Sequence, residues 1–161
     1  MRVYEHIDVS APPSVVWELV SDPSRALEFM AFTRWEVVGE PRRGLGARYR
    51  MLMHVGAAEL GGLVEVVEYT PERDLAWNSV TGLDVRGRWR LRERPHNRTQ
   101  VQLRLAYGVA GAGVGGWIAE RVAAPAVRSN LRRSLEQLKH QVELGELRKL
   151  AERRAVGRLA D

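Results

Sequence analysis

The stretch IDVSAPPSVVWELVSDPSRALEFM, residues 7–30, places a broken helix directly after a first strand. Alternating apolar residues up to Val9 predict the strand, and the apolar spacing that follows predicts the helix. The helix is expected to end at the Asp22-Pro23 step, because a residue before proline avoids helical geometry. The chain then restarts as one or two helical turns, with Ser24 as the expected N-cap. One interpretation is that the broken helix forms a rim that covers a binding site.

After this segment the apolar period changes from about 3.6 to two residues, which predicts strands. Short turns separate the segments, as is typical of an antiparallel meander with one solvated face. The expected strands cover residues 33–39, 47–55, 59–69, 75–80, 85–94 and 99–109. The clearest alternation is in 85–94, where Val85, Gly87, Trp89 and Leu91 are expected to face inward.

The helical period returns near residue 117 and continues to the end of the chain. Its apolar stripe comprises Trp117, Val122, Val127, Leu131, Leu135, Leu138 and Val142. Pro125 lies within this run and is expected to kink the helix or divide it. A sheet with one apolar face and a helix with one apolar stripe bury both surfaces when the sheet wraps round the helix. The expected fold is therefore α+β: a curved seven-stranded antiparallel sheet, two short helices after the first strand, and a long C-terminal helix.

Composition excludes several kinds of site. The 161 residues suffice for one domain and include no cysteine, which rules out disulfides, a thiolate nucleophile and zinc–cysteine sites. The four histidines are scattered without carboxylates at ligand spacing, so no metal is expected. The charged N-terminus does not resemble a signal peptide, and no run reaches the ~20 apolar residues of a membrane span. A cytoplasmic protein is expected.

The formal net charge is +5, and seven arginines lie between Arg86 and Arg104. Alternation puts four of them, at 86, 88, 90 and 92, on the outer face of one strand. One interpretation is a solvated face opposite acids such as Glu65 and Glu68. The other is a contact with an anionic partner, either membrane headgroups or an acidic carrier protein. Nucleic acid is not an expected partner, because Trp89 points to the other face and no base-stacking aromatics remain.

The inner strand face collects large aromatic and polarizable side chains, and these are the candidate ligand-binding residues. They are Trp35, Tyr49, Met51, Met53, Trp77, Ser79, Trp89 and Tyr107. Such residues often do no more than fill a core. Together they also suit the wall of a pocket for a flat apolar ligand, with the hydroxyl groups as hydrogen-bonding members.

The segment GAGVGG, residues 111–116, matches a dinucleotide-binding fingerprint letter by letter. A fingerprint of this kind opens a β–α–β unit, and no strand follows the helix here. We therefore expect no cofactor and interpret the segment as a hinge before the long helix.

The order and spacing of several stretches carry a resemblance to a known superfamily. The stretches are residues 7–30, RWEVVGE, VEVVEYTPERDLAW, GRWRLRE, TQVQLRLAY and LRRSLEQLKHQVE. Across residues 3–143 the chain resembles the START-like (SRPBCC, birch-pollen-allergen-like) superfamily, in particular its polyketide cyclase/dehydrase and lipid-transport branch. The resemblance implies a helix-grip domain over 1–143, and leaves 144–161 as a helical extension, a frayed tail or an oligomer contact.

The resemblance also implies an elongated cavity between the sheet and the long helix, with the short helices at its mouth. The expected ligand is a hydrophobic small molecule such as a lipid, a quinone or a polyketide, carried or sensed without an assigned reaction. A polyketide cyclase or dehydratase using the same cavity is the alternative, and an adaptor with an exposed arginine face is a third. Some cyclases of the superfamily place an arginine in the cavity. Arg121 is the nearest counterpart here, and Trp117 beside it joins the candidate ligand-binding residues, while no catalytic residue is assigned.

Overall fold

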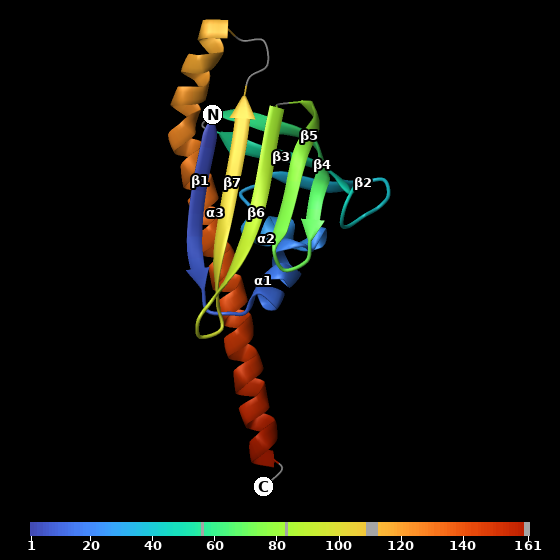
Figure 1. Ribbon diagram of the computed structural model, residues 1–161, viewed down its shortest axis with the longest axis vertical. Coiled ribbons are helices and arrows are strands. Elements are labelled where there is room, and N and C mark those ends of the chain that lie inside the picture. The colour runs from blue at the N-terminus through green and yellow to red at the C-terminus, as the bar shows by residue number, and fades with distance from the viewer. Residues whose placement is uncertain (56, 83, 109–112, 160–161) are drawn as a thin grey trace.

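The computed structural model describes the backbone of residues 1–55, 57–82, 84–108 and 113–159, and their side chains except those of 55, 58, 60, 113–123 and 159. The expected element order is confirmed (Figure 1). The elements are β1 (Arg2–Val9), α1 (Pro13–Val20), the 3-10 turn η1 (Pro23–Arg25), α2 (Ala26–Phe29), β2 (Arg34–Val38), β3 (Arg48–Val55), β4 (Ala58–Thr70), β5 (Asp74–Gly82), β6 (Asp84–Arg94), β7 (Arg98–Gly108) and α3 (Gly113–Leu159).

All strand pairs are antiparallel, and the seven strands form one sheet in the order β1-β7-β6-β5-β4-β3-β2. The first strand therefore pairs with the last one, and β1 and β2 are the two edges of an open sheet. Helix α3 packs against β1, β7 and β3 and also contacts both short helices. The sheet curves round α3, and α1 and α2 cover the region beside it (Figure 1).

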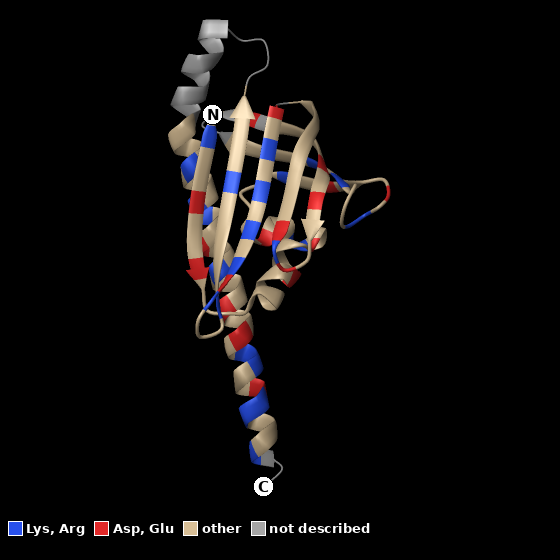
Figure 2. Ribbon diagram, viewed as in Figure 1, with Lys and Arg blue, Asp and Glu red and all other residues tan. Residues whose placement is uncertain are grey.

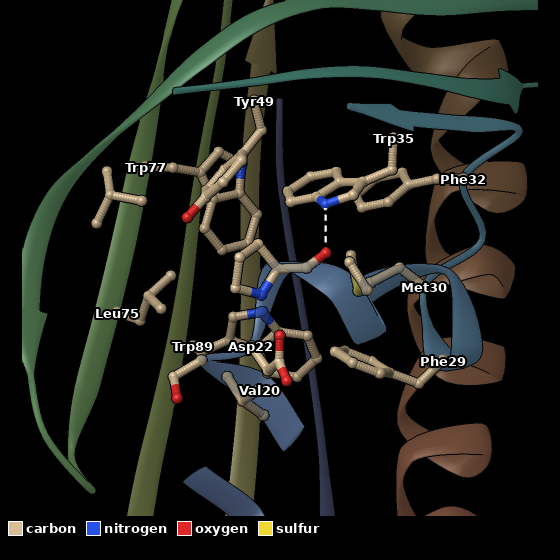
Figure 3. Close-up of a pocket in the computed structure, with 14 residues that line it drawn as sticks. Val20, Asp22, Phe29, Met30, Phe32, Trp35, Tyr49, Leu75, Trp77 and Trp89 are labelled. Carbon is tan, nitrogen blue, oxygen red and sulfur yellow. Dashed lines mark hydrogen bonds between the residues drawn. The ribbon is translucent and has the colours of Figure 1, made fainter. Parts of the chain in front are cut away.

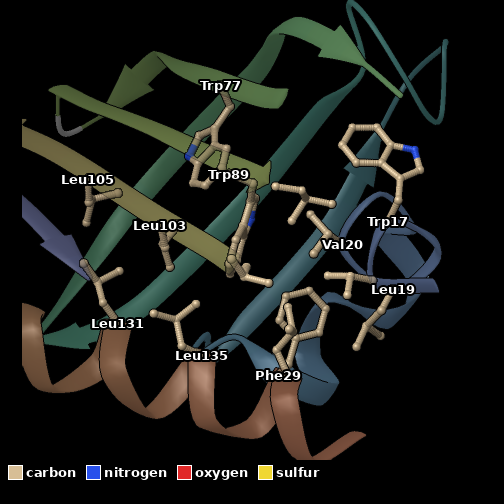
Figure 4. Packing of buried hydrophobic residues seen from close by; sticks show 14 of the residues in the cluster. Trp17, Leu19, Val20, Phe29, Trp77, Trp89, Leu103, Leu105, Leu131 and Leu135 are labelled. Atoms are coloured by element: carbon tan, nitrogen blue, oxygen red, sulfur yellow. The ribbon is translucent and has the colours of Figure 1, made fainter. Parts of the chain in front are cut away.

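The core forms where the apolar strand face meets the stripe of α3. In β6 the inward residues are buried as the alternation predicts, and the arginines between them are exposed or half-buried. The stripe of α3 is buried at Val127, Leu131, Leu135, Leu138 and Val142. In Figure 4 Leu131 and Leu135 point from α3 toward Leu103 of β7. The helix-grip arrangement expected from the sequence is confirmed.

Helix α3 continues through Pro125 without dividing, so of the two expected effects of this proline the division is wrong and a kink stays a prediction. Its last segment also remains helical to Leu159, and Leu147, Leu150 and Val156 are exposed there. The boundary between a domain of residues 1–143 and an extension stays a prediction. The glycine segment 111–116 is only partly described: its last four residues begin α3, and the first two lie outside the described residues.

The arginines of β6 are held largely by acids of neighbouring strands. Asp74, the first residue of β5, stands opposite Arg90 in the sheet register, and its carboxylate accepts a 2.8 Å hydrogen bond from Arg90 Nε. Arg88 and Arg92 each approach the same carboxylate to 3.6 Å, and Arg88 also pairs with Glu68. Asp74 is therefore the centre of the network.

The arginines on the outer face of β6, which form an arginine stripe, are expected from the sequence to face Glu65 and Glu68, and only one of these two acids does so. Glu68 does pair with Arg88 in the middle of that stripe. Glu65 instead pairs with Arg48 of β3, 2.7 Å away, because the two residues are directly opposite in the β3–β4 register. The solvated-face interpretation is therefore correct for the centre of the stripe.

We expect Asp74→Asn to lower the free energy of unfolding by about 1–2 kcal/mol at neutral pH, because charge-assisted hydrogen bonds are lost while partly exposed arginines recover solvent. Burial raises the pKa of Asp74, but the hydrogen bond from Arg90 and the charges of Arg90, Arg92 and Arg88 lower it below 3.8 overall. The carboxylate therefore contributes stability above pH 3.8, and this contribution is lost as the pH falls through the depressed pKa. Urea unfolding at a series of pH values measures both effects. An equal acid dependence in the wild type and the variant would contradict this role.

Gly87 of β6 provides the space in which the indole of Trp77 lies. A Cβ atom at position 87 would overlap Cζ2, Cε2 and Cη2 of that ring. Trp77 is opposite Gly87 in the β5–β6 register and is buried. Glycine in the interior of a strand weakens that strand. At position 87 this cost is offset because the missing side chain lets the large Trp77 ring approach the backbone closely.

Gly87→Ala is expected to destabilise the protein by about 1–3 kcal/mol, because the overpacked indole must leave its position. The matched control is Gly145→Ala, where no atom lies within 4 Å of the added Cβ on the surface of α3. The control should stabilise the helix by about 0.5–1 kcal/mol. Denaturant unfolding of both variants measures the difference, and a neutral Gly87→Ala would show that Trp77 is not confined.

Candidate functional site

The break after α1 is stabilised by an aspartate and not by the serine expected as its cap. Asp22 Oδ1 accepts hydrogen bonds from the Ser24 backbone N–H at 2.9 Å and from the Ser24 hydroxyl at 2.7 Å. Asp22 is therefore the N-cap of η1, and the prediction for Ser24 is wrong. The reason is local: Pro23 keeps Asp22 extended, which directs its carboxylate at the free amide two residues later.

The broken helix lines one side of a pocket whose other side is the inner face of the sheet (Figure 3). The break contributes a polar edge, whereas the strands contribute large rings. The lining residues are Val20, Ser21, Asp22, Pro23, Ala26, Phe29, Met30, Phe32, Trp35, Tyr49, Val66, Leu75, Trp77 and Trp89. None of them belongs to α3, so this pocket lies between the sheet and the short helices. The cavity between the sheet and the long helix that the resemblance implies is a different one and stays a prediction, because the side chains of residues 113–123 of α3 lie outside the described residues.

The pocket is largely filled by its own walls. Its empty space is about 480 Å³ when the open mouth is included. The cavity itself has a volume of about 50 Å³, which is room for a few water molecules. An aromatic ligand therefore enters only if side chains at the mouth move aside.

Trp35 fixes the mouth of the pocket. Its ring is stacked between Phe32, with centroids 5.1 Å apart, and Tyr49, with centroids 4.6 Å apart. Its Nε1–H donates a 2.6 Å hydrogen bond to the carbonyl oxygen of Pro23 in the break (Figure 3). The indole thus ties the edge strand β2 to the broken helix, and places a row of flat rings at the entrance.

Tyr49 brings a neutral hydroxyl to the pocket wall. Its side chain is buried, and the hydroxyl donates a weak hydrogen bond of 3.4 Å to the Arg42 carbonyl oxygen. Burial, with a smaller contribution from Tyr69, raises the pKa of Tyr49 to about 12. At neutral pH the phenol is therefore a hydrogen-bond donor with no charge.

Asp22 brings a carboxylate to the same pocket. The hydrogen bond from the Ser24 side chain lowers the pKa of Asp22 below 3.8, against an opposing effect of burial and with help from Arg43. Arg43 also donates a 2.8 Å hydrogen bond to Ser21 Oγ. The polar edge thus consists of an ionised carboxylate, a serine hydroxyl and a nearby guanidinium.

One buried donor on the pocket wall has no hydrogen-bond partner among the described residues. Trp77 Nε1 forms no hydrogen bond within the described part of the chain, although the side chain is buried. An unsatisfied buried N–H costs about 1–3 kcal/mol. An oxygen atom of a bound molecule would remove this cost.

The structure brings together four of the sequence-predicted site residues: Trp35, Tyr49, Trp77 and Trp89. The other described candidates, Met51, Met53, Ser79 and Tyr107, do not line this pocket. Met51 is buried in the core, and Ser79 Oγ accepts a hydrogen bond from the Val85 amide. The side chains of Trp117 and Arg121 lie outside the described residues. Their assignment, like a ligand-binding role for all ten, stays a prediction.

Sequence reasoning missed the pocket residues that follow the break. Phe29, Met30 and Phe32 come from α2 and the connection to β2, and Phe29 packs edge-on against Trp89 with centroids 5.9 Å apart. A signal was present, because three large apolar side chains in four positions exceed what one short helical turn buries. Had the break been treated as part of the pocket wall, these residues would have been included.

Within the described part of the chain, no group of three histidines, acids or cysteines could hold a metal ion. The helices found in the same part of the chain include none with the length and apolarity of a membrane span.

Comparison with known proteins agrees with this architecture. The family described as polyketide cyclase / dehydrase and lipid transport matches residues 1–143. The chain belongs to this family. Curated protein sequences contain no significant match.

Several solved structures have a similar fold. TTHA0849 from Thermus thermophilus is 21% identical, with a TM-score of 0.76 over 90% of this chain and 99% of that one. The Zhui aromatase/cyclase from Streptomyces sp. R1128 is 22% identical, with a TM-score of 0.72 over 89% of this chain and 93% of that one. A START superfamily protein from Mycobacterium smegmatis is 15% identical, with a TM-score of 0.69 over 89% and 97%. At these identities the likeness shows the fold alone.

The elevated pKa of Tyr49 can be tested by following tyrosinate absorbance after rapid jumps to alkaline pH. The titration of Tyr49 is the rise in absorbance that the wild type shows and Tyr49→Phe lacks, and its midpoint is expected at about pH 12. Between pH 10 and about 12 the folded protein keeps a proton that the unfolded chain releases, so the free energy of unfolding falls as the pH rises. If the variant instead loses a step near pH 10, the phenol is solvated and is not part of a closed wall.

Proposed function

We propose that this protein binds a flat, hydrophobic small molecule that carries at least one oxygen atom, such as a quinone or an aromatic polyketide. The observation that carries the proposal is the pocket beneath the broken helix, with its indole and phenol rings and its polar edge. Sites for small molecules are typically concave and mostly apolar, with a few convergent polar groups. The membership of the chain in a cyclase and lipid-transport family supports the same class of ligand.

Burial of the ligand would provide most of the binding free energy. Each 100 Å² of apolar surface removed from water contributes about 2.5 kcal/mol in the transfer limit. Stacking against Trp35 and Tyr49 favours planar molecules over flexible chains. A ligand oxygen near Trp77 Nε1 would satisfy the unpaired donor, and the Tyr49 hydroxyl offers a second hydrogen bond.

Entry requires the mouth to open. Met30 and Phe32 lie in the short connection between α2 and β2, are only half-buried, and have no regular secondary structure to hold them. Their displacement would enlarge the pocket without disturbing the sheet. The proposed movement is therefore local to this connection.

Catalysis of ring closure or dehydration in the same pocket is the second candidate. Ser21, Asp22 and Tyr49 give it polar groups. However, efficient proton transfer needs a group whose pKa is near the working pH. The pKa of Asp22 is lowered and that of Tyr49 is raised to about 12, so both move away from neutrality. These shifts suit hydrogen bonding to a bound ligand better than proton transfer, and they favour carriage or sensing.

The test fills the pocket and measures binding of Nile red, a neutral flat dye that carries a carbonyl oxygen, by fluorescence titration. Leu75 lines the pocket, so Leu75→Trp should weaken dye binding at least tenfold. The matched control is Leu45→Trp, at a position that is 64% exposed, and it should bind like the wild type. Met30→Ala enlarges the mouth and should strengthen or accelerate binding.

Circular dichroism of each variant separates loss of binding from loss of folding. Equal binding by Leu75→Trp and the wild type would place the ligand elsewhere. Absence of saturable binding in the wild type and in Met30→Ala would overturn the proposal. Native mass spectrometry with organic extraction then identifies a molecule that copurifies with the protein.

A further inference from the structure

The outer face of the sheet, remote from the pocket, carries an open groove over β1, β7, β6 and β5. Its floor contains small side chains, among them Ala76 and Ala106, and longer side chains form its walls. Arginine dominates those walls at positions 2, 86, 88, 90 and 104, together with Tyr4, Val67 and Asn78.

These arginines divide into two groups according to their partners. Arg88 and Arg90 are half-buried and pair with Glu68 and Asp74, so the fold itself compensates their charge. A further partner would have to displace those carboxylates. The remaining three, Arg2, Arg86 and Arg104, form the group that we call the outer arginine triad.

Within the described residues, little compensates the charge of the outer arginine triad. The one acid near Arg86 there is Asp84 at 3.9 Å, and both side chains are more than half exposed, which makes the pair weak. Arg104 lies over the Tyr4 ring at 5.2 Å, which fixes its position and leaves its charge in place. No ion pair of Arg2 or Arg104 occurs within residues 1–55, 57–82, 84–108 and 124–158.

The sheet register holds the triad in a compact arrangement. Arg2 is opposite Ala106, and Ala106 is in turn opposite Arg86, so their Cα atoms are two strand spacings, or about 10 Å, apart. Arg104 lies two residues from Ala106 on β7, about 7 Å along the strand. Basic segments of β1, β7 and β6 accordingly lie side by side in Figure 2.

We propose that this groove docks an acidic helix of a partner protein. Carboxylates at positions i and i+7 of a helix are about 10 Å apart along one face, which matches the separation of Arg2 and Arg86, and a carboxylate at i+4 lies between them on the side where Arg104 can reach it. Tyr4 and Val67 are 42% and 46% exposed beside it and offer apolar contact to the same helix. A lipid surface is flat and fits a hollow with a small-residue floor less well than a helix does. The inference is independent of the pocket, which opens on the other face of the sheet.

The experiment uses the full chain and a synthetic helical peptide with glutamate at i, i+4 and i+7 and leucine between these positions. Binding is followed by chemical-shift mapping and titration at low and high salt. The triad variant is Arg2→Glu, Arg86→Glu, Arg104→Glu. The matched control carries the same charge change at three exposed arginines of α3: Arg148→Glu, Arg153→Glu, Arg154→Glu.

The expected result is a set of shifts confined to β1, β6 and β7, at least tenfold weaker binding by the triad variant, and little change in the control. A scrambled peptide of the same composition should bind more weakly than the helical one. Equal losses in both variants would show a general charge effect and overturn the proposal. Triad-dependent binding to vesicles of phosphatidylglycerol and phosphatidylcholine, without binding of the peptide, would overturn it in favour of a membrane.

Discussion

The structure depends on the burial of one apolar stripe of α3 against the concave face of the sheet. Leu131, Leu135 and Leu138 are almost completely removed from solvent, and Leu103 and Val101 of β7 are fully buried on the facing strand. Neither surface has another way to leave water, because a lone amphipathic helix and a one-sided sheet are each marginal by themselves. Once this contact forms, the chain between β1 and β2 has to cover the part of the sheet that α3 does not reach. The pocket lies beneath that cover.

The cover is a broken helix because of the Asp22-Pro23 step. A continuous helix would direct its side chains along one straight line, whereas the break turns the chain and lets Pro23 receive the hydrogen bond from Trp35. The same turn leaves Ser21 and Asp22 at the pocket wall. One proline-directed interruption thus accounts for both the polar edge and the position of the aromatic mouth.

The strand faces and the stripe of α3 could be predicted because they depend on local alternation. Trp89 is buried and Arg88 faces outward for the same reason, namely that successive strand residues point to opposite faces. The central role of Asp74 could not be predicted in this way, since it depends on the β5–β6 register that puts it opposite Arg90. The selection of Trp35 and Tyr49 for the pocket, but not Met51, depends equally on how far residues 30–33 fold back over the sheet. Periodicity contains no information about that path.

Helix α3 continues well past the sheet. Its segment 147–158 is exposed on all sides, and in Figure 1 it runs away from the sheet toward the C-terminal end. An isolated helix this short would rarely form in water, because the first turn fixes several dihedral angles for a single hydrogen bond. Here the packed turns around Leu138 and Val142 have already met that nucleation cost, so the later turns form by propagation alone. The exposed turns are therefore helical only because they continue from turns that pack in the core. Amide protection against hydrogen exchange should decrease gradually along this segment instead of ending at one residue.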